Sequence, residues 1–265
     1  VGWPHDSLAP IESCATQLAA LLVSQLDPNC PRHIVFVCHS QGGLLARATA
    51  LELFGTQGTV DWKTRVASIV TFGTPHTGAA IVESGFKGGQ EAALYLMMLN
   101  GTHRFISLVD VLTVIQERKS EGLEDLKAFN ASTPERETSF VRQLLKEELK
   151  TLWPNNRNRP DMILVGGKLG TEQLDTWRKR VVAAFIEHKL GDRSHDLVVE
   201  IDSSIPRELH TRASVAPYAD HFGYFDESAP SAQAMDPALA SIWLLLEPEV
   251  KQWRVSLEED DNRPA

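Results

Sequence analysis

Hydrophobic residues in the first eighty positions form two kinds of pattern: a regular spacing typical of helices and short continuous runs typical of buried strands. Over residues 11–26, apolar side chains recur every three or four positions, which predicts an amphipathic helix. His33 to Cys38 is instead a short continuous apolar run, as in a strand buried on both faces of a parallel sheet. A second helix is predicted over 41–54 and a second buried strand over 66–72. This order predicts a βαβ unit, which builds parallel sheets with right-handed crossovers.

The pattern changes in residues 81–159, where helical spacing dominates and no strong strand is found. The helical stretches are joined by polar connections and lie near 90–99, 105–118 and 136–152. We therefore expect a helical cap or lid inserted above the sheet. Its leucine, methionine and phenylalanine side chains are expected either to form an apolar wall for a ligand or to pack against the core.

Strands resume after this insertion. Met162 to Val165 is another continuous apolar run, and helices are predicted near 171–189 and 236–253. The expected organisation is one α/β core formed by residues 1–80 and 160–256, followed by a polar tail at 257–265. A chain of 265 residues is long enough to bury such a core.

Composition narrows the range of partners. Asp and Glu outnumber Lys and Arg by 35 to 26, and the formal charge of −9 disfavours nucleic acid as a partner. Cys14, Cys30 and Cys38 are too few for a disulfide framework and match no zinc spacing. We expect no metal and no cofactor. No apolar run reaches the length of a transmembrane helix, about 18 residues, and no signal peptide is visible. A reducing compartment such as the cytoplasm is favoured.

Ser40 stands between the first strand and the helix that follows it. A tight strand-to-helix turn lifts a serine hydroxyl clear of the sheet and aims the first N–H groups of the helix at a reacting oxygen. Small residues are needed two positions before and after, and Gly42 meets this need while Cys38 is small but not minimal. We predict that Ser40 is a nucleophile and that the backbone N–H of Gln41 forms half of an oxyanion hole. The alternative is a serine that only caps the helix.

Two motifs now carry a family resemblance. His39-Ser40-Gln41-Gly42-Gly43-Leu44 is followed, after the next strand, by Phe72-Gly73-Thr74-Pro75-His76-Thr77-Gly78. These segments resemble HSxGGL and FGTPHxG of the serine esterase and lipase-like branch of the α/β hydrolases, which includes lipases, esterases that deacylate glycosylphosphatidylinositol anchors, and hydrolase domains fused to immune-type proteins. The resemblance covers residues 33–80 well and 196–222 loosely. It implies an α/β-hydrolase fold, with a mostly parallel sheet flanked by helices.

In this fold the acid follows the serine and the histidine follows the acid, so both are expected after the sheet resumes at residue 162. Asp196 begins an Asp-Leu-Val-Val segment that is similar to the family's DGxV segment, with Leu197 in place of the family's Gly. Asp196 is therefore the predicted acid, which would hold the histidine in the correct tautomer. Asp202 and Asp192 are the alternatives.

The general base is expected after Asp196. His221 lies in a segment that is similar to the family's late DH loop, 25 residues beyond Asp196, which leaves room for a final strand and a loop. We predict that His221 takes the Ser40 proton and returns it to the leaving group. His210 is the alternative base.

Two further histidines are expected to shape the substrate pocket. His39 is adjacent to the predicted nucleophile. His76 leaves the sheet at the same carboxyl end, where ligands bind in open α/β sheets. The resemblance implies that His76 forms part of the pocket floor. Zinc at His76, as in some lipases, is the minor alternative, because no matching His-Asp set is visible.

The resemblance also implies that the second oxyanion N–H lies in an early His-Gly loop, and no such loop precedes residue 11. We therefore expect early strands to be missing from this chain. Either another segment or domain supplies them, or the chain is a remnant of the fold. The expected function is hydrolysis of carboxylic esters, lipid acyl esters included, through an acyl-enzyme. A thioesterase, amidase or peptidase would use the same side chains, since leaving-group preference depends on pocket shape. The other alternative is a catalytically silent hydrolase fold that serves as an interaction module.

Overall fold

A computed structural model of the chain describes residues 9–26, 33–58, 60–79, 125–126, 139–151, 160–169, 180, 194–196, 198–209, 212–217, 221 and 224. The elements are, in chain order, α1 (Ile11–Gln25), β1 (Ile34–His39), α2 (Gln41–Gly55), α3 (Trp62–Arg65), β2 (Val66–Phe72), α8 (Phe140–Thr151), β3 (Asp161–Lys168), α10 (Ile201–Ser204) and β4 (Arg212–Pro217). Among the described helices, none combines the length and the apolar character needed to cross a bilayer.

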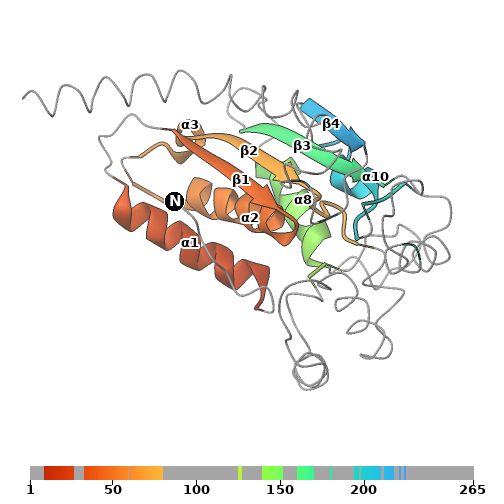
Figure 1. Cartoon of the computed structure of the whole chain (residues 1–265). Coiled ribbons are helices and arrows are strands. Elements are labelled where there is room, and N and C mark those ends of the chain that lie inside the picture. Colours follow the sequence, from red (N-terminus) through yellow and green to blue (C-terminus); the bar gives the residue numbers. More distant parts are fainter. Residues whose placement is uncertain are drawn as a thin grey trace, which may run out of the picture.

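The described strands form one parallel sheet in the order β1-β2-β3-β4. Their arrows run in the same direction in Figure 1, so their carboxyl ends meet at one end of the sheet. His39, the last residue of β1, is in register with Phe72, the last residue of β2. Because Ser40 and Gly73 come directly after these residues, the two turns lie side by side at this end of the sheet.

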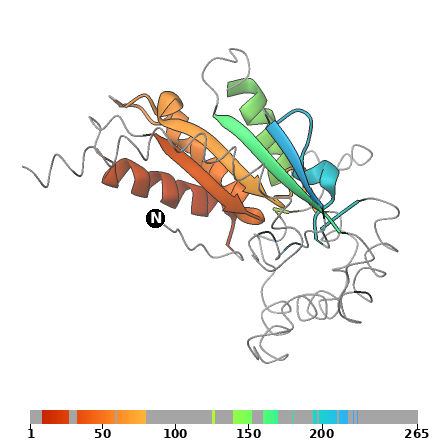
Figure 2. The ribbon, with the colours of Figure 1, turned by 45° about the horizontal axis from the view of Figure 1, so that its top comes forward.

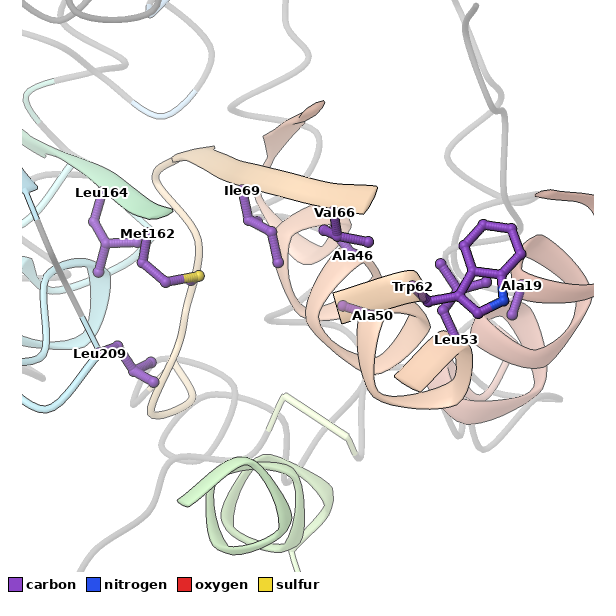
Figure 3. Close-up of a cluster of buried hydrophobic side chains, with 10 residues drawn as sticks. All are labelled: Ala19, Ala46, Ala50, Leu53, Trp62, Val66, Ile69, Met162, Leu164 and Leu209. Carbon is purple, nitrogen blue, oxygen red and sulfur yellow. The ribbon is translucent and has the colours of Figure 1, made fainter. Parts of the chain in front are cut away.

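Helices α1, α2 and α8 cover one face of this sheet, as Figures 1 and 2 show from two directions. The principal cluster on that face joins Trp62 and Leu53 to Val66 and Ile69 of β2 (Figure 3). Each of these side chains is at least 95% buried. Burial of a large apolar side chain stabilises the fold by about 1.5–3 kcal/mol, so this contact holds α2 firmly against the strand that carries the second turn.

Helix α8 comes from the predicted insertion but packs against the core. Its apolar residues Val141 and Leu144 share one buried cluster with Leu44 of α2 and Ile11 of α1. The start of α1 is also tied to the insertion, because Asp125 Oδ2 accepts a hydrogen bond from Ile11 N at 2.9 Å. These parts of the 81–159 range therefore belong to the helical layer over the sheet. The predicted helices at 90–99, 105–118, 171–189 and 236–253 and the tail at 257–265 lie outside the described residues, except Arg180, which is helical.

The predicted βαβ unit is confirmed, with element ends that differ from the prediction by at most one residue. The third strand is longer than the apolar run 162–165, since Gly166 and Gly167 continue it. Strand β4 occupies the space expected for a final strand between Asp196 and His221. Its sequence, Arg-Ala-Ser-Val-Ala-Pro, has no continuous apolar run and could not be located by periodicity.

Candidate active site

Ser40 occupies the turn between β1 and α2 in a backbone conformation that is rare for any residue except glycine. Its φ is 53° and its ψ is −133°, and it is the one described non-glycine residue with positive φ. Such a conformation is strained and persists only where the surroundings enforce it. Ser40 N donates to Phe72 O at 2.9 Å, and Ser40 O accepts from Thr74 Oγ1 at 2.8 Å. The turn after β2 therefore holds the turn after β1 in its strained shape.

The closest approach of α2 to these turns is at Gly43. A Cβ atom on Gly43 would lie 2.3 Å from Thr74 Oγ1, whereas one on Gly42 would meet only Cys38 Cβ at 3.9 Å. The sequence pattern predicts the tight contact at Gly42 and Cys38. The structure places it one residue later, which explains why a cysteine is accommodated at position 38.

Three side chains that are far apart in the sequence meet beyond this turn. His221 Nε2 is 2.8 Å from Ser40 Oγ, and His221 Nδ1 is 2.9 Å from Asp196 Oδ2. Asp196 is fully buried and His221 is 2% exposed. An ionised carboxylate can only accept, so His221 Nδ1 carries the proton and Nε2 presents its lone pair to the serine hydroxyl. The geometry thus links hydroxyl, imidazole and carboxylate in one line of hydrogen bonds.

The Asp196 carboxylate is also held by the backbone that follows it. Asp196 Oδ1 accepts from Val198 N at 3.0 Å and from Val199 N at 2.8 Å. Burial is the largest influence on the pKa of Asp196 and would raise it. The positive charge of a protonated His221, the hydrogen bond from His221 and the two backbone N–H groups together lower this pKa below its ordinary value. Asp196 is therefore ionised at neutral pH. Asp202 is exposed on α10, and Asp192 and His210 lie outside the described residues.

His39 holds the backbone of His221. Its Nε2 is 2.6 Å from the carbonyl oxygen of His221, which can only accept, so His39 Nε2 carries the proton. The two rings are 4.8 Å apart between centroids. Burial and, next, the positive charge that His221 carries when it is protonated lower the pKa of His39, so the His39 ring is neutral at neutral pH. The His39 side chain is half-buried and adjacent in sequence to Ser40. Its role in the substrate pocket stays a prediction.

His76 lies in the interior rather than on the surface of a pocket. The ring has no exposed area, and Arg47 Nη1 donates to its Nδ1 at 3.1 Å. Its Nε2 therefore carries the proton and donates to Thr71 Oγ1 at 3.0 Å. Burial, and then the charge of Arg47, hold the pKa of His76 well below its ordinary value. Both ring nitrogens are thus engaged by the protein, in contrast to the pocket-floor position that the resemblance implied.

Two other features of the site were not anticipated from the sequence. Tyr224 OH donates to Asp196 Oδ2 at 2.8 Å, so this oxygen accepts from two side chains. Arg47, which also contacts His76, forms a bidentate ion pair with Glu148 of α8; Arg47 Nε to Glu148 Oε1 is 2.8 Å, and Arg47 Nη2 pairs with Oε2. Neither pair has a local signal, since its partners are 28 and 101 residues apart.

The Cys38 thiol, two residues before Ser40, is not a competing nucleophile. Burial raises the pKa of the Cys38 thiol to about 12, which keeps it protonated and unreactive. In the part of the chain that the structure describes, no group of three or more His, Cys, Asp or Glu side chains is placed to hold a metal ion. Gln41 begins α2 directly after Ser40, so its backbone N–H belongs to the helix N-terminus, where negative charge is stabilised.

Similarity to one solved lipase structure agrees with this architecture. No protein-family model matches the chain, and no curated protein matches its sequence. The mature form of lipase BlEst2 from Bacillus licheniformis is similar at a TM-score of 0.53, with 16% identity over 88% of this chain and 74% of that one. Phospholipase PlaB from Legionella pneumophila has a TM-score of 0.49 and 11% identity, over 77% of this chain and 36% of that one. A lipase from Staphylococcus hyicus has a TM-score of 0.47 and 17% identity, over 83% of this chain and 71% of that one. The chain has an α/β-hydrolase fold.

Proposed function

We propose that the chain is a serine hydrolase that cleaves carboxylic esters through an acyl-enzyme. The observation that carries the proposal is the pair of hydrogen bonds that join Ser40 Oγ to His221 Nε2 and His221 Nδ1 to Asp196 Oδ2. The positive φ of Ser40 also supports the proposal, because strained backbone conformations cluster at functional sites. Ser40 lies at the carboxyl end of the parallel strands. A serine that served only as a helix cap would need neither the strain nor the imidazole, and the side chain of Ser40 makes no capping hydrogen bond to α2.

In the first half of the proposed reaction, Ser40 Oγ attacks the ester carbonyl carbon while His221 Nε2 accepts the hydroxyl proton. The Gln41 N–H stabilises the oxyanion of the tetrahedral intermediate, and Asp196 stabilises the imidazolium. The bond between the carbonyl carbon and the alkoxide oxygen then breaks, and His221 gives its proton to that oxygen. The products are an alcohol and an acyl group on Ser40.

In the second half, a water molecule takes the place of the alcohol. His221 Nε2 accepts one water proton as the oxygen attacks the acyl carbon, and the bond to Ser40 Oγ breaks with return of that proton to the serine. A carboxylic acid leaves. Asp196 stays ionised throughout, consistent with its lowered pKa.

For the substrate we propose a carboxylic ester, with lipid acyl esters included. Support comes from the fold shared with a bacterial lipase. The same side chains would cleave thioesters or amides, because they act on the acyl carbon whatever the leaving atom is. A catalytically silent module of the same fold is the competing proposal, and a turnover assay separates it from an enzyme.

We expect the purified chain to release p-nitrophenol from p-nitrophenyl butyrate, and a fluorophosphonate that modifies activated serines to abolish this release. The residual rate should fall in proportion to the fraction of protein labelled, because one serine carries the reaction. Turnover that persists in fully labelled protein would contradict the proposal. So would stoichiometric labelling without any turnover of butyrate, thioester or amide substrates, which is the behaviour of a silent module.

A further inference from the structure

Tyr224 is bound to the carboxylate that orients the proposed base. Its hydroxyl and His221 Nδ1 share the same oxygen, Asp196 Oδ2, at 2.8 and 2.9 Å. Two backbone N–H groups occupy the other oxygen, Oδ1. A carboxylate has about four acceptor positions, so Tyr224 supplies the last of them. Because Asp196 is fully buried, loss of this donor would leave a charged oxygen incompletely satisfied.

The ring of Tyr224 is held so that its hydroxyl has little freedom to move. The side chain is 2% exposed and meets the ring of Phe72 at 6.1 Å and the ring of His39, edge to face, at 5.9 Å between centroids. Gly73 leaves the space for it, because a Cβ there would lie 2.8 Å from Tyr224 Cε2 and 2.7 Å from Asp196 Oδ2. Gly73 also has a φ of 56°, which a glycine adopts without strain. Residues at the ends of β1 and β2 thus pack around the Tyr224 ring and restrict its movement.

Together with two hydrogen bonds of the backbone, these contacts close a ring of four residues. His39 Nε2 donates to His221 O, His221 N donates to Asp196 O at 2.7 Å, Tyr224 donates to Asp196, and Tyr224 contacts His39. Every member of the ring restrains either the imidazole or the carboxylate. Nothing in this arrangement requires the phenol to touch the substrate.

We infer that Tyr224 is a positioning residue, whose hydroxyl fixes the Asp196 carboxylate with Oδ2 facing His221 Nδ1. The inference rests on the proposed function. A donor to the charged form of an acid lowers the proton affinity of that acid. Among the titratable groups that are described, His221 acts on this carboxylate directly and His39 acts on it at longer range.

The test is Tyr224→Phe, which removes the hydroxyl and keeps the ring that packs on Phe72. We expect kcat/KM for p-nitrophenyl butyrate to fall about tenfold, with the loss in kcat and not in KM, which corresponds to about 1.4 kcal/mol. The acidic limb of the pH profile should also move to higher pH, because the Asp196–His221 pair takes up a proton more readily when the donor is lost. The rate of labelling by a fluorophosphonate should show the same displacement.

Ile69→Val is the matched control, since it trims a buried side chain of β2 in the main core cluster and lowers stability by about 0.5–1.5 kcal/mol. It should leave the pH profile unchanged. If Tyr224→Phe matches wild type in rate and profile, or loses activity with an unmoved profile like a merely destabilised protein, the inference is overturned. Ser40→Ala in the same series separates the two failures, because full activity of that variant would overturn the proposed function itself.

Discussion

Replacement of Asp196 by asparagine is expected to lower kcat/KM for p-nitrophenyl butyrate by on the order of 10⁴-fold, with the fold intact. The two backbone N–H groups that donate to Oδ1 determine the orientation of the asparagine amide. They require an acceptor, so the amide oxygen stays there and the NH₂ group takes the place of Oδ2. That group donates to His221 Nδ1 and forces the ring proton onto Nε2. The imidazole then donates to Ser40 Oγ and cannot accept its proton.

Asp202→Asn is the matched control for this variant. Asp202 lies on α10 with an exposed side chain, and the same loss of one negative charge there should change kcat/KM by less than about twofold. A Michaelis–Menten comparison of both variants with wild type provides the check. Equal activity of Asp196→Asn and Asp202→Asn would remove the carboxylate from the mechanism.

Glu148→Gln is expected to reduce the free energy of unfolding by about 3–5 kcal/mol, the largest effect on stability that we predict. Arg47 is fully buried and its guanidinium is paired bidentately with Glu148, which is 5% exposed. A glutamine of the same shape cannot neutralise the guanidinium and turns an N–H donor toward it. The buried charge is then left without its counterion. Since Arg47 also donates to His76, the turn after β2 should loosen together with α8.

Guanidinium-induced unfolding, followed by circular dichroism, measures this loss. Glu147→Gln is the control, because Glu147 is on the same helix with 58% of its side chain exposed and forms only a 3.7 Å surface pair with Lys150. Exposed pairs contribute about 0–1 kcal/mol. If the two variants unfold at the same denaturant concentration, the buried pair does not stabilise the fold as we describe.

The central part of the fold was predictable because its signals are local. A continuous apolar run, a serine between small residues and a helix at regular spacing all lie within residues 33–55, and the structure builds β1, the Ser40 turn and α2 from them. Asp196 and His221 were found by chain order together with short motifs. The structure brings both side chains to Ser40.

Contacts between distant segments could not be predicted in the same way. Tyr224 reaches Asp196 only because Gly73, from another loop, leaves room for its ring. His76 belongs to a motif that predicts a pocket residue. In the structure its imidazole is buried and accepts a hydrogen bond from the buried guanidinium of Arg47, which needs acceptors. Strand β4 pairs with β3 through its backbone, and backbone pairing leaves no apolar pattern when the strand contains serine and alanine.

In the proposed mechanism, His221 and Asp196 activate Ser40 as a nucleophile. The most direct measurement is the reaction of a fluorophosphonate with wild type and with Ser40→Ala, followed by mass spectrometry of the peptides. We expect one adduct per wild-type chain, located on Ser40, and none on the variant. Equal labelling of the two proteins, or an adduct on another serine of the wild-type chain, would contradict it.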